Sequence, residues 1–243
     1  AFYSKMDAAH RPHQLWVRIR SLGAQGAPAD HMLFEESDER FWLSFWKSRS
    51  GRFLFVASKS KETTEMRMLD LLELDTIVRE ECSEPKDLDL AGLMRLIAAR
   101  RQGVIYRVDH MEALDHLMVV TNAGAKKEFA LCLAPVDAPG EASWFELEGF
   151  QYDPARYVLG VNCFRDFAVI TGREDGLMQI WVLRLRKASA GAKVEVESLH
   201  RVPFDEDAYE VHFSARNKVY DTDCFRVIYS SMVTPTSTLE VRA

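Results

Sequence analysis

The sequence predicts an all-β fold: a fragment of a β-propeller built from four-stranded antiparallel blades, three complete and two partial. Two observations support this. Short apolar segments recur along the chain with turn residues between them, and each is flanked by further strand-like segments. Aromatic residues make up 11% of the chain, and aromatic side chains pack well on pleated sheets.

Four apolar segments mark the repeat. They are residues 53–57, 117–120, 167–170 and 225–229. Three of them are apolar on both alternating faces, which is typical of a strand buried from both sides, although a short buried helix gives the same pattern. Their length and flanking turns favour strands. They recur roughly every 50 to 65 residues, close to the period of propeller blades, and a β-sandwich with long loops is the alternative.

Each of these inner strands has expected partners on both sides in sequence. Preceding strands are expected at 41–46, 103–108, 157–161 and 209–213, following strands at 65–69, 128–133, 177–183 and 237–241, and fourth strands at 74–78, 143–147 and 194–199. Strands at 2–5, 13–20 and 32–36 make up the first partial blade. Because each blade packs between two neighbours, this order explains why the inner strands are apolar on both faces.

One segment, about residues 83–101, departs from the strand pattern. Leu90, Leu93, Met94 and Ile97 recur at the spacing of one helical face. The pattern predicts a short helical insertion between two blades. It is interpreted as a local lid over apolar surface, with a partner-binding role as the alternative.

Composition and charge exclude several classes of function. Hydrophobic residues make up 47% and charged residues 28%, as in ordinary globular proteins. The net charge is −6, and the Lys and Arg residues are scattered beside acids, so we expect no nucleic-acid partner. The sequence contains no apolar run of about 18 residues and no signal peptide, so we expect no membrane partner.

The four cysteines show no metal-binding spacing. They are Cys82, Cys132, Cys163 and Cys224, and their separation gives neither a CxxC pair nor a zinc knuckle. Disulfides remain open from sequence, but free buried thiols in a reducing compartment are favoured, which predicts a cytoplasmic location.

Catalytic and cofactor motifs are missing from the sequence. A serine hydrolase needs a G-x-S-x-G elbow, and Ser50-Gly51 lacks the flanking glycine. Metalloprotease, P-loop and dinucleotide motifs are also absent. His10 and His13 have no acidic or cysteine partner at metal spacing and are expected in a loop. We therefore predict no catalytic residue, no metal and no cofactor in this chain.

Two clusters of acidic residues are the candidate functional residues. They are Glu35, Glu36, Asp38 and Glu39, and Asp205, Glu206 and Asp207. From the residues alone, solvated loop charge between strands is the favoured interpretation. The alternative is a contact with a basic neighbour, domain or peptide.

Several stretches resemble the propeller of oligopeptidase B-type members of the prolyl oligopeptidase family of serine peptidases. The resembling segments are 7–16, 34–42, 48–55, 64–67, 134–137, 164–166 and 173–177, then YDTD at 220–223 and YSSMVTP at 229–235. None is specific alone, but they are collinear over almost the whole chain. Residues 78–102 depart from the resemblance, because this region is longer than expected of the family.

The resemblance implies a larger protein in which the propeller covers an α/β-hydrolase domain with a Ser-Asp-His triad. Such a protein cleaves short peptides after Arg or Lys, and the propeller acts as a gate and size filter. The chain, residues 1–243, would be the middle and end of the propeller, with Ala1 an internal position and the hydrolase domain outside it. No catalytic role therefore carries over to any residue here.

The implied partners are the hydrolase domain, short basic peptides and a second copy that covers the open ends of the fragment. The acidic clusters become candidates for gating substrate or for contacting the catalytic domain. A stand-alone propeller that serves as a protein-interaction scaffold is the competing reading, because propellers host many functions. An enzyme with an unrecognised site in the propeller channel is disfavoured by the missing motifs.

Overall fold

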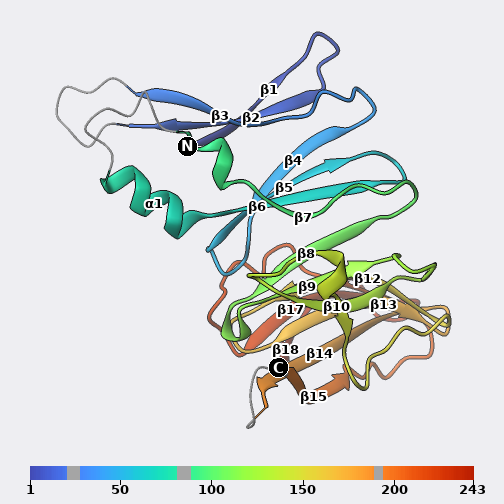
Figure 1. The fold of residues 1–243 in the computed structure, drawn as a ribbon. Helices are drawn as coiled ribbons and strands as arrows, with labels where there is room; N and C mark the ends of the chain where they lie inside the picture. Colours follow the sequence, from blue (N-terminus) through green and yellow to red (C-terminus); the bar gives the residue numbers. More distant parts are fainter. Residues whose placement is uncertain (21–27, 81–88, 189–193) are drawn as a thin grey trace. The chain divides into compact units, whose positions relative to one another are not determined.

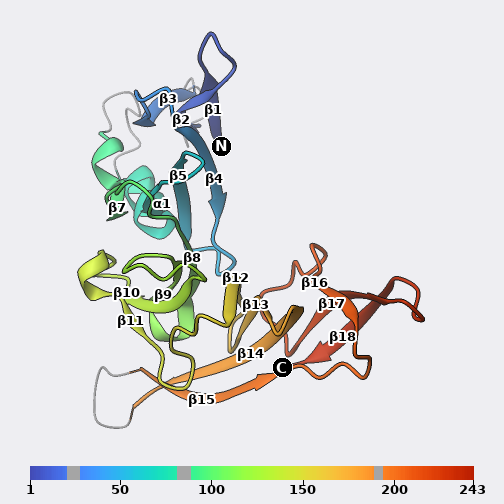
Figure 2. The same ribbon diagram turned by 90° about the vertical axis from the view of Figure 1, so that its right-hand side faces the viewer.

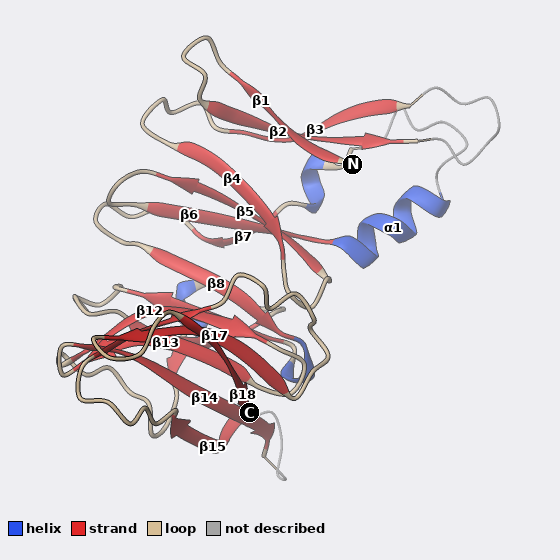
Figure 3. Cartoon of the chain, turned by 180° about the vertical axis from the view of Figure 1, so that it is seen from behind, coloured by secondary structure: helices blue, strands red, loops and turns tan. Residues whose placement is uncertain are grey.

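The computed structural model describes residues 1–20, 28–80, 89–188 and 194–243. The chain divides into two compact units, Ala1–Val104 and Ile105–Ala243. The described strands form five antiparallel sheets, and in each sheet the strands follow one another in sequence order (Figure 1). Strands account for nearly all of the regular structure, as the red ribbons in Figure 3 show.

The first unit contains a three-stranded and a four-stranded sheet. The first sheet is formed by β1 (Phe2–Met6), β2 (Pro12–Ile19) and β3 (Ala29–Glu35), and the second by β4 (Trp42–Lys47), β5 (Phe53–Lys59), β6 (Thr64–Asp70) and β7 (Arg95–Ala98). Leu15 and Val17 of β2 pack in one core with Leu54 and Val56 of β5. The two sheets therefore share a hydrophobic core, as adjacent blades do.

The second unit contains two four-stranded sheets and one three-stranded sheet. Their strands are β8 (Tyr106–Met111), β9 (His116–Thr121), β10 (Ala130–Pro135) and β11 (Phe145–Glu146); β12 (Arg156–Cys163), β13 (Ala168–Glu174), β14 (Leu177–Lys187) and β15 (Val194–Arg201); and β16 (Tyr209–Phe213), β17 (Cys224–Ser231) and β18 (Ser237–Arg242). Short 3-10 helices span Ala91–Leu93 in the first unit, and Glu112–Leu114 and Glu141–Ser143 in the second.

The middle sheet of the second unit, β12 to β15, explains why the inner strands are apolar on both faces. Ile170 of β13 packs in a core with residues of the β8–β11 sheet, whereas its neighbour Val169 packs in a core with Phe225 and Val227 of β17. Successive side chains of a strand point to opposite faces. Figure 2 shows the β12–β15 and β16–β18 sheets of this unit.

The turn between β13 and β14 illustrates the link between sequence and local geometry. Asp175 and Gly176 both have positive φ, 53° and 78°. A two-residue hairpin turn of this kind needs positive φ at both positions, which Asp-Gly tolerates well. The turn therefore lies between the two strands that the sequence predicts at 167–170 and 177–183.

The predicted blade order is also confirmed: the described strands form three sheets of four strands and two of three. The strand bounds agree with the predicted ones to within a few residues, except for the segment between β6 and β7. In the described part of the chain, no helix is long and apolar enough to cross a membrane.

The prediction between residues 71 and 101 is wrong. The helix is α1 (Leu71–Glu80), which occupies the predicted fourth strand at 74–78, and the fourth strand is β7. Residues 83–88 of the predicted helix lie outside the described residues, and 89–101 contain only a short 3-10 turn followed by β7. Leu90 and Ile97 are buried. The apolar residues that suggested a helix therefore pack into the core from a turn and the strand that follows it.

Candidate functional site

The first acidic cluster lies where β3 ends and the chain crosses to β4. Glu36 is 3% exposed, whereas Glu35 and Glu39 are exposed and Asp38 is half-buried. Asp38 forms an ion pair with Arg40 at 2.7 Å. Hydrogen bonds from Arg40 hold the pKa of Asp38 down at about 2. The cluster therefore contains one buried and three more accessible carboxylates.

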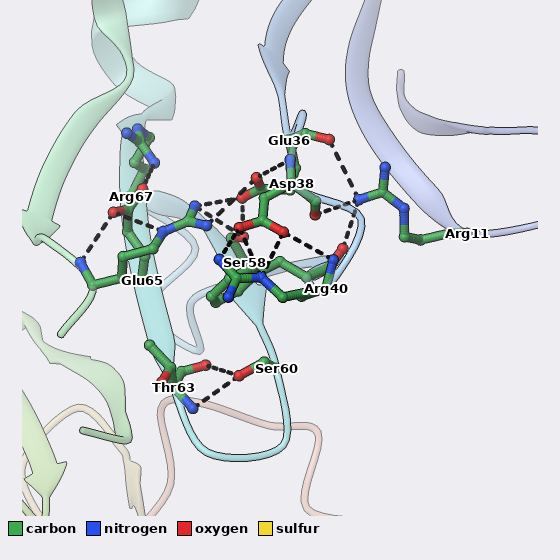
Figure 4. Close-up of polar contacts among 11 residues, drawn as sticks. Arg11, Glu36, Asp38, Arg40, Ser58, Ser60, Thr63, Glu65 and Arg67 are labelled. Carbon is green, nitrogen blue, oxygen red and sulfur yellow. Dashed lines mark hydrogen bonds and ion pairs between the residues drawn. The ribbon is translucent and has the colours of Figure 1, made fainter. Parts of the chain in front are cut away.

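Glu36 belongs to a network of side chains in the first unit, which we call the Arg100 cluster. Its members are Glu36, Ser58, Glu65, Arg67 and Arg100. Arg100 donates to the carboxylates of both Glu36 and Glu65, and its backbone N–H donates to Glu65 at 3.0 Å. Ser58 also donates to Glu36, and Arg67 to Glu65. Figure 4 labels four members of the cluster: Glu36 just after β3, Ser58 on β5, and Glu65 and Arg67 on β6.

The electrostatics of the Arg100 cluster favour charged carboxylates. Burial alone would raise the pKa of Glu36, but hydrogen bonds from Arg100, Ser58 and the N–H of Asp38 outweigh it, and the pKa is lowered. The pKa of Glu65 is lowered in the same way, with burial opposed by hydrogen bonds from Arg100 and Arg67. Carboxylates that are already ionised and paired are poor proton acceptors, so the cluster is suited to holding structure.

A buried arginine, Arg11, holds the crossing segment itself. Arg11, 5% exposed, lies in the turn between β1 and β2. Its guanidinium donates to the backbone carbonyls of Asp38 at 2.9 Å and Phe41 at 2.7 Å, and to Asp7 at 2.8 Å. The Arg100 guanidinium stacks on the Phe41 ring, 4.0 Å from its centroid. The two arginines thus fasten the first sheet of this unit to the second.

Neither Arg11 nor Arg100 stands out in the sequence. An arginine in a polar turn is usually solvated, and nothing local marks Arg11 as buried or Arg100 as half-buried. One signal could have pointed to such arginines: Glu36 and Glu65 lie at buried strand ends, and buried carboxylates need cationic partners.

The second acidic cluster lies in the loop between β15 and β16 of the second unit. Asp205 and Asp207 are exposed, whereas Glu206 accepts a hydrogen bond from Thr234 at 2.6 Å. Hydrogen bonds from Ser231 and Thr234 lower the pKa of Glu206. Glu206 therefore ties this loop to the turn between β17 and β18. The two acidic clusters lie in different units.

The turn that Glu206 holds presents two apolar side chains. Met232 is 93% exposed and Val233 is 82% exposed. The Ser231 hydroxyl accepts hydrogen bonds from the N–H groups of Val233 and Thr234, at 3.1 and 2.8 Å. The turn is therefore ordered by its own hydrogen bonds while its apolar tip lies in solvent.

The described cysteines and possible metal ligands offer little basis for a reactive site. Cys132 and Cys224 are free thiols, Cys163 is buried, and Cys82 lies outside the described residues. Burial raises the pKa of Cys132 to about 11, so it is an unreactive thiol at neutral pH. Among the described residues, no group of three His, Cys, Asp or Glu side chains is arranged to hold a metal ion.

Five antiparallel sheets of three or four sequential strands, with neighbouring sheets inside each unit sharing a core, define a β-propeller domain. Comparison with known proteins identifies its family. Residues 1–243 match the family described as prolyl oligopeptidase, N-terminal β-propeller domain. The chain belongs to this family.

Relatives with assigned names are peptidases of much greater length. The chain is 35% identical to Protease 2 of Moraxella lacunata over 98% of its own length and 29% of that protein. It is 28% identical to dipeptidyl aminopeptidase BI of Pseudoxanthomonas mexicana, covering 99% of this chain and 28% of that one. The chain therefore spans under a third of the relatives it matches.

Solved structures give the same assignment. Oligopeptidase B from Trypanosoma brucei, in a closed form with covalently bound antipain, is 25% identical with a TM-score of 0.76, covering 98% of this chain and 30% of that one. Oligopeptidase B from Leishmania major is 24% identical with a TM-score of 0.78, covering 99% and 30%. The likeness of the propeller to oligopeptidase B is thereby confirmed.

Proposed function

We propose that the chain is the propeller part of an oligopeptidase B-like serine peptidase, in which it gates a separate α/β-hydrolase catalytic domain. One observation carries this proposal: all of residues 1–243 match the propeller domain of the family, yet the chain covers only 29% of Protease 2. More than two thirds of such a relative lies outside the matched region. A catalytic domain is the expected content of that remainder.

The role of the propeller in this proposal is physical exclusion. A rigid shell over a hydrolase site admits short flexible peptides, keeps out folded proteins and completes a closed site around the substrate. The sheet pairs and the Arg100 cluster supply rigidity within the first unit, because each charged group is held by several hydrogen bonds. The chain supplies no nucleophile elbow of its own.

We also propose that the parent protein prefers Arg or Lys before the cleaved bond. The accessible acidic residues raise the local concentration of cationic peptides. These are Glu35, Glu39, Asp205 and Asp207, which are exposed. Glu36 contributes little to such attraction, because its charge is already neutralised by Arg100. Free buried thiols suit a reducing compartment, and we propose a cytoplasmic location for the same protein.

The test uses the full-length protein that carries this chain. A fluorophosphonate probe should label one serine outside residues 1–243, and labelling should block hydrolysis of a short peptide with Arg before the cleaved bond. The same peptide with an apolar residue at that position should be cleaved with a much lower kcat/KM. A full-length protein that neither labels nor hydrolyses either peptide would instead support the interaction-scaffold reading.

A further inference from the structure

A large groove in the second unit is not used by the gating proposal. Its volume is about 920 Å³, within the range of roughly 300–1,000 Å³ that is typical of ligand pockets. One wall is formed by β11 and the loop after it, and the other by the start of β15. Figure 2 labels both strands. Each is the last strand of its sheet, so the groove runs between two sheet edges.

The charges that line the groove have one sign. Glu146, Glu148 and Glu195 contribute carboxylates, and no Lys or Arg is among the described residues that line it. Glu146 is partly neutralised by Lys126. Glu195 lies 3.3 Å from Arg186, and both side chains are at least 40% exposed, so this pair is weak. Glu148 is exposed. Net negative charge therefore faces the groove.

An aromatic surface lies beside these carboxylates. Phe145 is 38% exposed, and its ring meets the His116 ring edge to face, with centroids 6.3 Å apart. The His116 ring is held in place by a 2.8 Å hydrogen bond between Nδ1 and the carbonyl of Leu114. A planar guanidinium group can stack flat on an aromatic face and pair with a carboxylate through two parallel hydrogen bonds, whereas an ammonium group acts as a point charge.

The backbone beside the groove can also bind an extended chain. β11 pairs with β10 through only Phe145 and Glu146, although β10 runs over six residues. Edge strands offer backbone N–H and C=O groups to an added strand. Extended peptides that add to a sheet edge take affinity from these groups and specificity from alternate side chains.

We propose that this groove binds an extended peptide segment that carries arginine. The guanidinium groups pair with Glu148 and Glu195, one of them stacks on Phe145, and the peptide backbone lies along β11. The proposal goes beyond the gating role, because it assigns a binding surface on the chain itself. It stands whether or not the parent protein is a peptidase.

The probe is a dye-labelled hexapeptide of alternating arginine and valine, titrated by fluorescence anisotropy. The titration uses the full-length protein after fluorophosphonate treatment, so that hydrolysis does not consume the probe. The matched control peptide carries citrulline, which keeps the shape of arginine without its charge. Binding should weaken at least tenfold with citrulline and should fall with added salt. Equal binding of the two peptides would overturn the proposal.

Two variants locate the bound peptide. Glu148→Gln combined with Glu195→Gln should weaken binding about four- to twenty-fold, because each exposed ion pair contributes about two- to five-fold. The control variant is Glu210→Gln, at an exposed position on β16, which should bind as the unchanged protein does. Hydrogen exchange should slow at β11 and at the start of β15 on binding. Unchanged affinity in the double variant, or protection elsewhere alone, would refute the site.

Discussion

Arg100 is the single cation shared by Glu36 and Glu65, so its removal should cost more than the loss of an exposed pair. We expect Arg100→Ala to lower the free energy of unfolding by about 2–4 kcal/mol, because the buried carboxylate of Glu36 loses its cationic partner. The matched control is Arg79→Ala, which breaks a pair with Asp75 in which the side chains are 70% and 57% exposed. That loss should be about 0.5 kcal/mol or less.

Urea denaturation of the two variants makes the comparison. Adding Glu36→Gln to Arg100→Ala should recover part of the stability, because the unpaired charge is removed. Equal losses for Arg100→Ala and Arg79→Ala would show that the Arg100 cluster contributes no more than a surface ion pair.

The lowered pKa values of Glu36 and Glu65 predict an acid dependence of stability. Their folded pKa values lie below the ordinary value of 4.5. In this pH range the unfolded chain therefore binds more protons than the folded chain does. The stabilisation is present above about pH 5 and is lost as the pH falls through the folded pKa values. The urea midpoint should therefore fall on acidification below pH 5, and it should fall less steeply in Glu36→Gln. An identical acid profile for both proteins would contradict this.

At the scale of the element, Gly172 of β13 makes the closest backbone approach among the glycines of the sheets. A Cβ there would lie 2.5 Å from the carbonyl oxygen of Tyr157 and 2.9 Å from the Trp181 ring. Gly172→Ala should therefore destabilise the chain by about 1–3 kcal/mol. Gly160→Ala on the paired strand is the control, because its nearest neighbour would be 3.7 Å away. Thermal unfolding of both variants tests this, and equal melting temperatures would contradict it.

The strands were predictable because their signal is local, and the segment between β6 and β7 was not. Phe53 to Ala57 alternates between two buried faces, and Asp175-Gly176 marks the turn between β13 and β14 without tertiary information. Leu74 and Leu90 pack in one core, from a helix and a turn respectively. Their spacing fits either type of element, and only packing against β2 and β5 decides between them.

The candidate site was predictable in part for the same reason. The acidic residues can be found in the sequence, but which of them are buried and which are exposed cannot. Glu36 is enclosed by Ser58 and Arg100 from two other segments and by the N–H of Asp38, whereas Glu39 is exposed. The groove between β11 and β15 brings together residues about 50 positions apart, so no local pattern marks it.

At the scale of the whole molecule, the 243-residue chain alone should self-associate. Its first and last sheets have three strands each, which leaves strand edges open to another chain. Apolar side chains such as Trp42, 55% exposed, and Met232 add to this tendency. Sedimentation velocity over a range of concentrations should show a dimer or larger species. A monodisperse monomer at high concentration with cooperative unfolding would show that the open edges are tolerated.

We propose that this propeller filters peptides by size for a catalytic domain of the same protein. The test measures kcat/KM of the full-length protein for a series of unstructured substrates that share one Arg-containing cleavage site. Their length increases from a hexapeptide to a whole unfolded domain. The same domain in its folded state is the last substrate. Exclusion by size should give efficient cleavage of the short peptides, a steep fall in kcat/KM with length, and no cleavage of the folded domain. A kcat/KM that is independent of length, together with digestion of the folded domain, would contradict it.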